Sequence, residues 1–165
     1  MRIWLVPFRE LDDQRVVGQH YEFHSIYRFV VERGWKWLQW HLPEHRLAFY
    51  NVHERIVEEM EIRGFKHTTP IEKPEITVPQ EPYPVSEEKV QAERWQLVCR
   101  WDGVYRGRLP MPSEYEPLLK KYHEQGGCIH DGPVEKVNTP DGPVELCLVC
   151  KRYVRTKDGL WIPRR

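Results

Sequence analysis

The pattern of hydrophobic and polar positions predicts helices in four parts of the chain. The first runs from Glu10 to about Arg33 and has one polar face, which contains Gly18. A glycine in mid-helix costs roughly 1 kcal/mol relative to alanine, so it points to close approach by a ligand or another backbone, or to helix packing. The other face is expected in the core: Val16, Val17, His20, Phe23, Tyr27, Val30 and Val31.

Capping and breaking residues set the bounds of the other three helices. Apolar residues at helical spacing, followed by Gly64 as a stop, predict one helix over residues 51–64. Ser86 is suited to cap the next helix, because acidic residues follow it. A capping box of Ser113 and Glu116 is expected to open the last one.

The remaining segments do not have helical spacing. An apolar, strand-like run opens the chain, and an aromatic segment over residues 34–50 is expected to form a connection with a short helical start. Five prolines between positions 70 and 84 exclude a helix there and predict an extended linker, or a strap laid over the first domain. Two Asp-Gly turns near the C-terminus predict small β-hairpins.

The order of these elements predicts a mainly α fold with a small β-hairpin module at the C-terminus. We expect a helical core over residues 1–70 and a proline-rich strap or linker over residues 71–94. Helices and the C-terminal module follow over residues 95–165.

The composition is that of a folded protein. Hydrophobic residues make up 40% of the 165 positions and include seven Trp and eight Tyr, enough for one good core. No apolar stretch approaches the length of a membrane span and no secretory signal is recognisable, so we expect an intracellular protein with no membrane partner. The net charge is zero, but the last fifteen residues hold six basic groups and one acid, which predicts a basic patch or a solvated end.

Cysteine and histidine residues near the C-terminus have the spacing of metal ligands. The expected set is Cys128, His130, Cys147 and Cys150. Two hairpin-like knuckles of this kind can close a tetrahedral Zn²⁺ site, which we expect to be structural because no position is left open for catalysis. His123 could replace His130, and Cys99 is a further alternative. Thiols without a metal, or a redox CxxC, are the competing interpretations.

Three segments carry a family resemblance: RIWLVPFRELDDQRVVGQHYE, HRLAFY and EIRGFKHTT. Their strongest pieces are ELDDQ at 10–14, a glutamate eight positions later, and RGF with the following TT. In order and spacing they resemble the pyrimidine-dimer DNA glycosylase / AP lyase family of the bacteriophage endonuclease V type, over roughly residues 1–70. The resemblance implies a compact helical bundle that acts on double-stranded DNA, with the small zinc-ribbon-like module that carries the cysteine cluster as an addition.

The resemblance also implies roles for particular residues. In the family the nucleophile is the terminal α-amine and its partner is a glutamate of the first helix, and these fall on Met1 and Glu22. Two positions that are basic in the family fall on Tyr21 and Ser25. The residues expected to contact DNA, by the resemblance or as phosphate clamps, are Arg2, Gln14, Tyr21, His20, His24, Arg28, Arg106 and Arg108.

A terminal amine suits this chemistry because its reference pKa is about 7.7–8.0, against about 10.4 for lysine, so roughly a quarter is neutral near pH 7.4. It can attack the sugar C1′ and leave an imine that promotes loss of the 3′ phosphate, while Glu22 stabilises positive charge. A nucleophile at residue 1 is also expected to forbid a leader. The alternative nucleophile is a lysine with a lowered pKa, Lys36 first.

The sequence therefore leaves three kinds of function open: an enzyme, a binding module and an adaptor. The first is a monomeric DNA glycosylase with AP-lyase activity that excises a pyrimidine dimer or another modified base, with zinc in a structural role only. The alternative is a zinc-stabilised module on the same fold that binds DNA or a protein partner without catalysis. A nuclease adaptor whose zinc ribbon binds single strands is a third.

Overall fold

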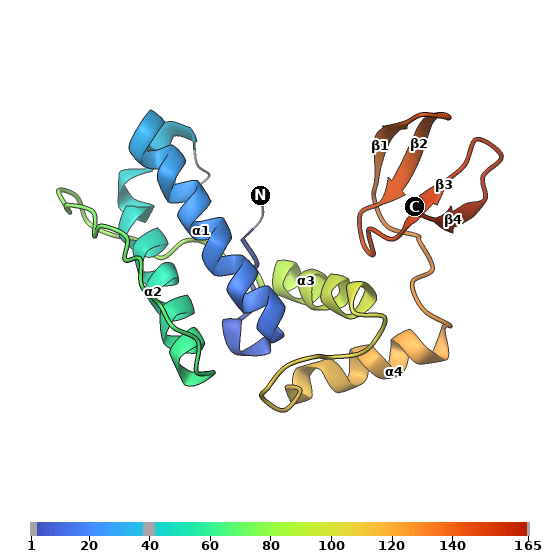
Figure 1. The fold of residues 1–165 in the computed structure, drawn as a ribbon, viewed down its shortest axis with the longest axis horizontal. Coiled ribbons are helices and arrows are strands. Elements are labelled where there is room, and N and C mark those ends of the chain that lie inside the picture. The colour runs from blue at the N-terminus through green and yellow to red at the C-terminus, as the bar shows by residue number, and fades with distance from the viewer. Residues whose placement is uncertain (1–2, 38–41, 165) are drawn as a thin grey trace. The chain divides into compact units, whose positions relative to one another are not determined.

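The computed structural model describes residues 3–37 and 42–164. The chain divides into a first unit, Met1–Val90 with Gly107–Pro110, and a second unit, Gln91–Arg106 with Met111–Arg165, each described by itself. The elements (Figure 1) are α1 (Asp13–Arg33), α2 (Arg46–Ile62), α3 (Glu87–Arg100), α4 (Glu116–Glu124), β1 (Val134–Thr139), β2 (Gly142–Cys147), β3 (Tyr153–Arg155) and β4 (Trp161–Pro163). The expected class, mainly α with a small C-terminal β module, is confirmed. Within the described ranges, no helix combines the length and apolar character needed to cross a bilayer.

Helix α1 begins later than the pattern predicts. Asp12 is its N-cap, and the Asp12 side chain accepts a hydrogen bond from the Arg15 N–H at 2.9 Å. The described part of the strand-like run before it forms no strand, and residues 8–10 make a 3₁₀ helix. A strand needs a neighbour for its backbone groups, whereas here the Trp4 N–H is bound by the side chain of Gln19.

The buried face of α1 is rotated from the predicted one. Its buried residues are Val16, Gln19, Phe23, Ile26 and Val30. Val31 is 68% exposed, so its assignment to the core is wrong, and Val17 is only half-buried. Successive helical residues point about 100° apart, so only one valine of an adjacent pair can face the core.

Helix α2 lies against α1 and begins at Arg46, earlier than predicted. Its buried residues are Phe49, His53, Ile56, Glu59 and Met60. The rings of Phe23 and Phe49 meet between the two helices with their centres 4.9 Å apart. The predicted stop is confirmed, because α2 ends just before Gly64, which has a φ of 76°.

The chain after α2 is extended, as its prolines predict. Residues 65–86 contain no helix or strand. The Glu81 N–H donates to the Glu44 carbonyl at 2.9 Å, and the Leu47 N–H donates to Gln80 Oε1 at 3.1 Å. This segment is a strap across the start of α2.

Of the caps predicted for α3 and α4, only that of α3 is found in the structure. Ser86 Oγ accepts a hydrogen bond from the Lys89 N–H at 3.3 Å, which confirms it as the cap of α3. The capping box predicted for the next helix is wrong. Ser113 begins a 3₁₀ turn and its hydroxyl contacts Glu114, while α4 begins only afterwards. Pro117 lies in the first turn of α4, where its missing N–H costs no hydrogen bond, and this favours the later start.

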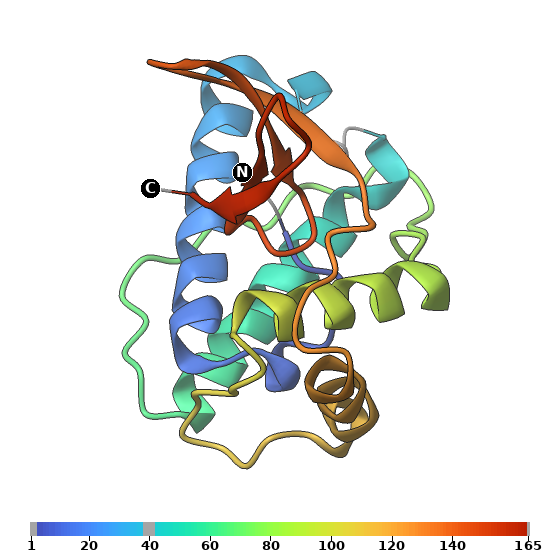
Figure 2. The same ribbon diagram turned by 90° about the vertical axis from the view of Figure 1, so that its right-hand side faces the viewer.

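The four strands form one antiparallel sheet in the order β1-β2-β3-β4. Figure 2 shows this part of the chain in orange and red. The two predicted hairpins are confirmed. Thr139 pairs with Gly142 around the first Asp-Gly turn, and Arg155 pairs with Trp161 across the second loop. Strand β2 ends at Cys147, so this hairpin leads directly into the CxxC pair.

Candidate functional site

One face of α1 binds the start of the described chain. Met1 and Arg2 themselves lie outside the described residues. The backbone N–H of Trp4 donates to Gln19 Oε1 at 2.7 Å in a buried contact. Glu22 follows Gln19 by one helical turn, so the two side chains share a face. The N-terminal segment is therefore held against the face of α1 that carries Glu22.

Glu22 is half-buried, and its Oε2 atom is buried with no hydrogen-bond partner among the described residues. A buried acceptor left unpaired costs about 1–3 kcal/mol, more if it is charged, so such a group calls for an explanation such as a catalytic role. A Cβ added at Gly18, one turn earlier, would meet nothing within 4 Å. The helix surface is therefore open at Gly18, and the described part of the chain brings no other backbone close to it.

The remaining residues predicted to contact DNA differ in their surroundings. Gln14, Tyr21 and Arg106 are exposed. Arg28 is also exposed, and its guanidinium pairs with Glu32 at 2.9 Å. Their roles in DNA binding stay predictions.

Arg108 is held by the protein's own packing. Its Nη1 donates to the Arg63 carbonyl at 2.6 Å, and its Nε lies 3.2 Å from an Asp13 carboxylate oxygen. The guanidinium carbon is 4.3 Å from the centre of the Phe65 ring. These contacts orient the side chain, which is still 56% exposed and available to a phosphate.

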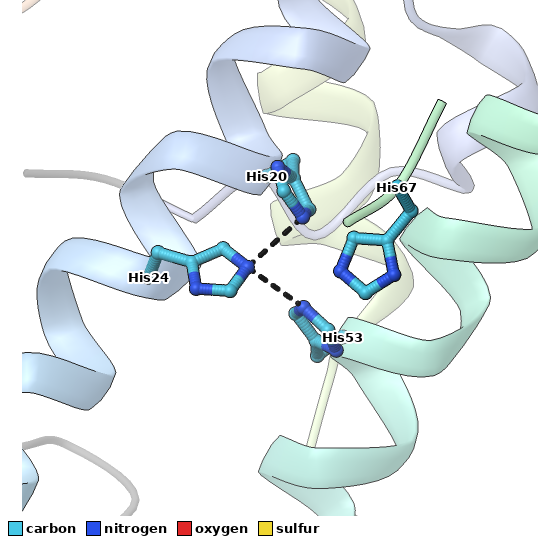
Figure 3. Close-up of side chains that lie close together, drawn as sticks. All are labelled: His20, His24, His53 and His67. Carbon is cyan, nitrogen blue, oxygen red and sulfur yellow. Dashed lines mark hydrogen bonds between the residues drawn. The ribbon is translucent and has the colours of Figure 1, made fainter. Parts of the chain in front are cut away.

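His20 and His24 lie in a cluster with two histidines that the sequence analysis did not single out, His53 and His67 (Figure 3). The Nε2 atom of His24 is 2.9 Å from that of His20 and 3.3 Å from that of His53. His53 Nδ1 lies 3.0 Å from a Glu54 carboxylate oxygen. The i, i+4 spacing of His20 and His24 was a usable sequence signal, but their meeting with the other two depends on helix packing.

Three of these histidines, His20, His24 and His53, have a pKa below the ordinary value for histidine. Burial, followed by the charges of His24, His67 and His53, lowers the pKa of His20 to about 4. Burial is also the main cause that lowers the pKa of His24 and of His53. A neutral imidazole offers a lone pair to a metal or a hydrogen-bond donor but brings no positive charge to a phosphate.

The predicted ligands of the C-terminal module do come together. Cys128, His130, Cys147 and Cys150 each offer a ligand atom within 4.8 Å of the others. The Sγ of Cys150 and the Nδ1 of His130 are 3.6 Å apart. Tetrahedral zinc, with Zn–S of about 2.3 Å and Zn–N of about 2.0–2.1 Å, would place these two atoms about 3.5–3.6 Å apart. The pair is already at the separation of a shared tetrahedral edge.

The backbone of the two knuckles positions these ligands. His130 and Lys151 have φ values of 57° and 55°, so each knuckle turns through the left-handed region. The Lys151 N–H donates to the Cys147 carbonyl at 2.9 Å, and the Arg152 N–H donates to Cys150 Sγ at 3.4 Å. An N–H bond to sulfur stabilises the thiolate that a metal requires.

Packing closes this candidate metal centre. Cys147 is fully buried. The centre of the His130 ring is 4.7 Å from that of Tyr153 and 4.8 Å from that of Trp161. A Cβ at Gly132 would overlap the Val149 side chain, so glycine permits the close approach of the two knuckles. A closed, well-packed donor set is typical of a structural metal site.

The alternative ligands lie outside the four-residue set. His123 is exposed, and Cys99 is buried in the adjoining core. A hydrogen bond with Cys99 and burial raise the pKa of Cys128, and burial raises the pKa of Cys150 to about 11. A metal ion bound here displaces protons from these thiols.

A pocket of about 1120 Å³ lies elsewhere in the first unit, along residues 3–9, α2 and residues 82–85. Three glutamates contribute to its lining: Glu54, Glu58 and Glu59. Two arginines, Arg9 and Arg55, line it as well, so its charge is mixed. Among the described residues, neither Glu22 nor any of the predicted DNA contacts lines it.

Comparison with known proteins supports the interpretation of the N-terminal part. A model of the family described as pyrimidine dimer DNA glycosylase matches residues 1–73. This confirms the resemblance, and the family is one of DNA glycosylases. Searches of curated proteins and of solved structures each found no match.

Proposed function

We propose that the chain is a DNA glycosylase with AP-lyase activity that excises a damaged or modified base, a pyrimidine dimer first, through an imine on the α-amine of Met1. One observation carries this proposal. Within the matched region, Gln19 holds Trp4 on the face of α1 where the carboxylate of Glu22 has a buried, unpaired oxygen. Three extended residues span at most about 11 Å, so an amine at Met1 can reach that carboxylate.

The chemistry needs a neutral amine and an exposed sugar carbon. The amine lone pair attacks C1′, and the glycosidic bond breaks with its electron pair leaving on the base. Loss of a proton from nitrogen and opening of the sugar ring give the imine. The imine acidifies the C2′ proton, and its removal expels the 3′ phosphate as the C3′–O bond breaks. Both steps use one nucleophile and require no metal.

In this proposal Glu22 acts on charge and on protons. Its carboxylate stabilises the positive charge that develops at the sugar as the base departs. It then accepts and returns protons during imine formation and elimination. A desolvated carboxylate strengthens both effects, because the electrostatic interaction grows as water is excluded. The open space at Gly18 leaves room for the nucleotide that must leave the base stack.

The second unit is proposed to hold one structural Zn²⁺ ion through Cys128, His130, Cys147 and Cys150. Three thiolates and one imidazole form a common structural zinc set, and the 3.6 Å edge between sulfur and nitrogen suits it. These residues would anchor both knuckles of the small sheet to each other. The module would then offer a folded surface of its own.

A strand-cleavage screen tests the proposed activity. The full chain is incubated with duplexes that carry a thymine dimer, an abasic site or one of several modified bases. We expect cleavage at the abasic site, from the lyase step, and at the dimer or one modified base. Cleavage of none of them with retained DNA binding would favour the non-catalytic binding module.

Glu22→Gln tests the role of the carboxylate, because it keeps the shape of the side chain and removes its charge. We expect near-complete loss of base excision, with DNA affinity within severalfold of the unmodified chain. Charge stabilisation in a transition state is worth several kcal/mol, whereas removing an acid does not weaken phosphate binding. Glu61→Gln, an exposed acid on α2, is the matched control and should keep full activity. Normal excision by Glu22→Gln would show that the carboxylate is structural.

A further inference from the structure

We propose that His20, His24, His53 and His67 form a second metal site, in the first unit, for a divalent transition metal such as Zn²⁺. Each offers one ring nitrogen, and these four atoms lie within 4.8 Å of one another. Figure 3 shows the rings turned toward one another, two from α1, one from α2 and one from the segment after α2. Nothing in the cysteine cluster or in the proposed glycosylase chemistry uses these side chains together.

The separations between nitrogens match those between the ligands of one ion. With metal–nitrogen bonds of about 2.0–2.1 Å, tetrahedral ligands lie about 3.3–3.4 Å apart and ligands at right angles about 2.8–3.0 Å apart. The Nε2 atoms of His24 and His53 are 3.3 Å apart, and those of His20 and His24 are 2.9 Å apart. The remaining separations are within 4.8 Å, so ring rotation on metal binding would bring the four nitrogens onto one centre.

Hydrogen bonding alone leaves this cluster incompletely paired. A neutral imidazole has one N–H, so His24 Nε2 cannot donate to both of its neighbours. Nε2 of His67 is buried and finds no hydrogen-bond partner in the part of the chain that the structure describes. One metal ion accepts a lone pair from each ring at the same time and so satisfies all four.

The donor set selects the class of metal. Four imidazoles suit zinc, copper, nickel or iron, whereas magnesium and calcium require oxygen ligands, which the cluster does not contain. The carboxylate of Glu54 contacts the other ring nitrogen of His53 at 3.0 Å, the outer-shell arrangement that orients a metal-binding histidine.

The position of the cluster favours a structural role. Glu22 is two residues from both His20 and His24, so it lies about 200° away around α1, on the opposite face. A metal bound to the histidines therefore joins α1, α2 and the following segment without reaching the proposed catalytic carboxylate. It would stabilise the helix pair on which the Gln19–Trp4 contact depends.

Metal stoichiometry of the full chain tests this inference. After dialysis against Zn²⁺ and removal of loosely bound ions, elemental analysis should find about two zinc ions per chain. Cys147→Ser should retain about one, and His67→Ala should also retain about one. His123→Ala, an exposed histidine outside both clusters, should keep both ions. One ion in the unmodified chain and none in Cys147→Ser would overturn the proposal, as would two ions in His67→Ala.

Two further measurements test the histidine site if a ligand variant fails to fold: the absorption spectrum of bound Co²⁺, and the metal affinity of a variant at Glu54. Co²⁺ bound to thiolates gives intense charge-transfer absorption, which an all-imidazole site lacks. Cys147→Ser loaded with Co²⁺ should therefore show visible d–d bands without that absorption. Removing an outer-shell partner usually weakens metal binding about 10–100-fold, so Glu54→Gln should do so at this site, while Glu61→Gln should not. Equal affinity in both variants, or no cobalt bands in Cys147→Ser, would contradict a histidine site.

Discussion

Replacing Arg63 with methionine should destabilise the first unit by about 3–5 kcal/mol, because it removes one partner of a buried ion-pair network. The Arg63 side chain is 0% exposed. It binds the following groups: the Glu59 carboxylate at 2.7 and 2.8 Å, the Leu11 carbonyl at 2.7 Å, Asp13 at 3.1 Å, and the Phe8 and Arg9 carbonyls at 3.2 and 3.3 Å. Methionine fills similar volume but donates no hydrogen bond, so the Glu59 carboxylate and the carbonyls lose the hydrogen bonds that Arg63 donates to them.

The assay is thermal unfolding of the full chain, monitored by far-ultraviolet circular dichroism. For a domain of this size each kcal/mol is worth about 4–8 °C in melting temperature, so the helical transition should fall by about 12 °C or more. Arg63→Lys should recover part of the loss, since lysine keeps the charge but has fewer donors. Arg55→Met, an exposed arginine on the same helix, should change stability by less than about 0.5 kcal/mol. A loss below about 1 kcal/mol in Arg63→Met would refute the role of Arg63 in joining the N-terminal segment to α2.

Further substitutions test the open space at Gly18 and the folding of the C-terminal module. Gly18→Ala should raise the free energy of unfolding by about 0.5–1 kcal/mol in thermal melts, because a Cβ there meets nothing within 4 Å. Base excision by this variant should fall if the substrate occupies the space beside Gly18. Unchanged excision would show that the substrate does not use that space. Cys147→Ser should abolish the folding of the C-terminal module, seen as loss of its dispersed amide signals in nuclear magnetic resonance, whereas Cys99→Ser should leave those signals in place. Equal damage by both serine variants would contradict the assignment of the ligands.

Features with a local cause could be predicted from the sequence. Ser86 caps α3 through a contact three residues away, and the two Asp-Gly turns close hairpins within a few residues. The Cys/His cluster could be predicted because the spacing within each knuckle is itself a signal, and its binding of a metal remains a prediction. Met1 and Glu22 came from the family resemblance, and their catalytic roles remain predictions.

Features that depend on distant partners could not be predicted. Gln19 is buried because the Trp4 N–H needs an acceptor, and Arg63 because backbone carbonyls around residues 8–11 converge on it. His53 meets His24 across 29 positions, so no periodicity within one helix reveals the pair. The capping box at Ser113 was wrong because Pro117 favours a start one turn later.

Covalent trapping tests the central claim that the amine of Met1 is the nucleophile. Borohydride added during reaction on a cleavable duplex should reduce the imine and leave a protein–DNA adduct on the N-terminal peptide, identified by mass spectrometry. Acetylation of Met1, or an uncleaved N-terminal tag, should abolish trapping while DNA binding persists, because an amide nitrogen is not nucleophilic and only one charge is lost. An adduct that survives N-terminal blocking, or that maps to a lysine such as Lys36, would contradict the assignment even if glycosylase activity were present.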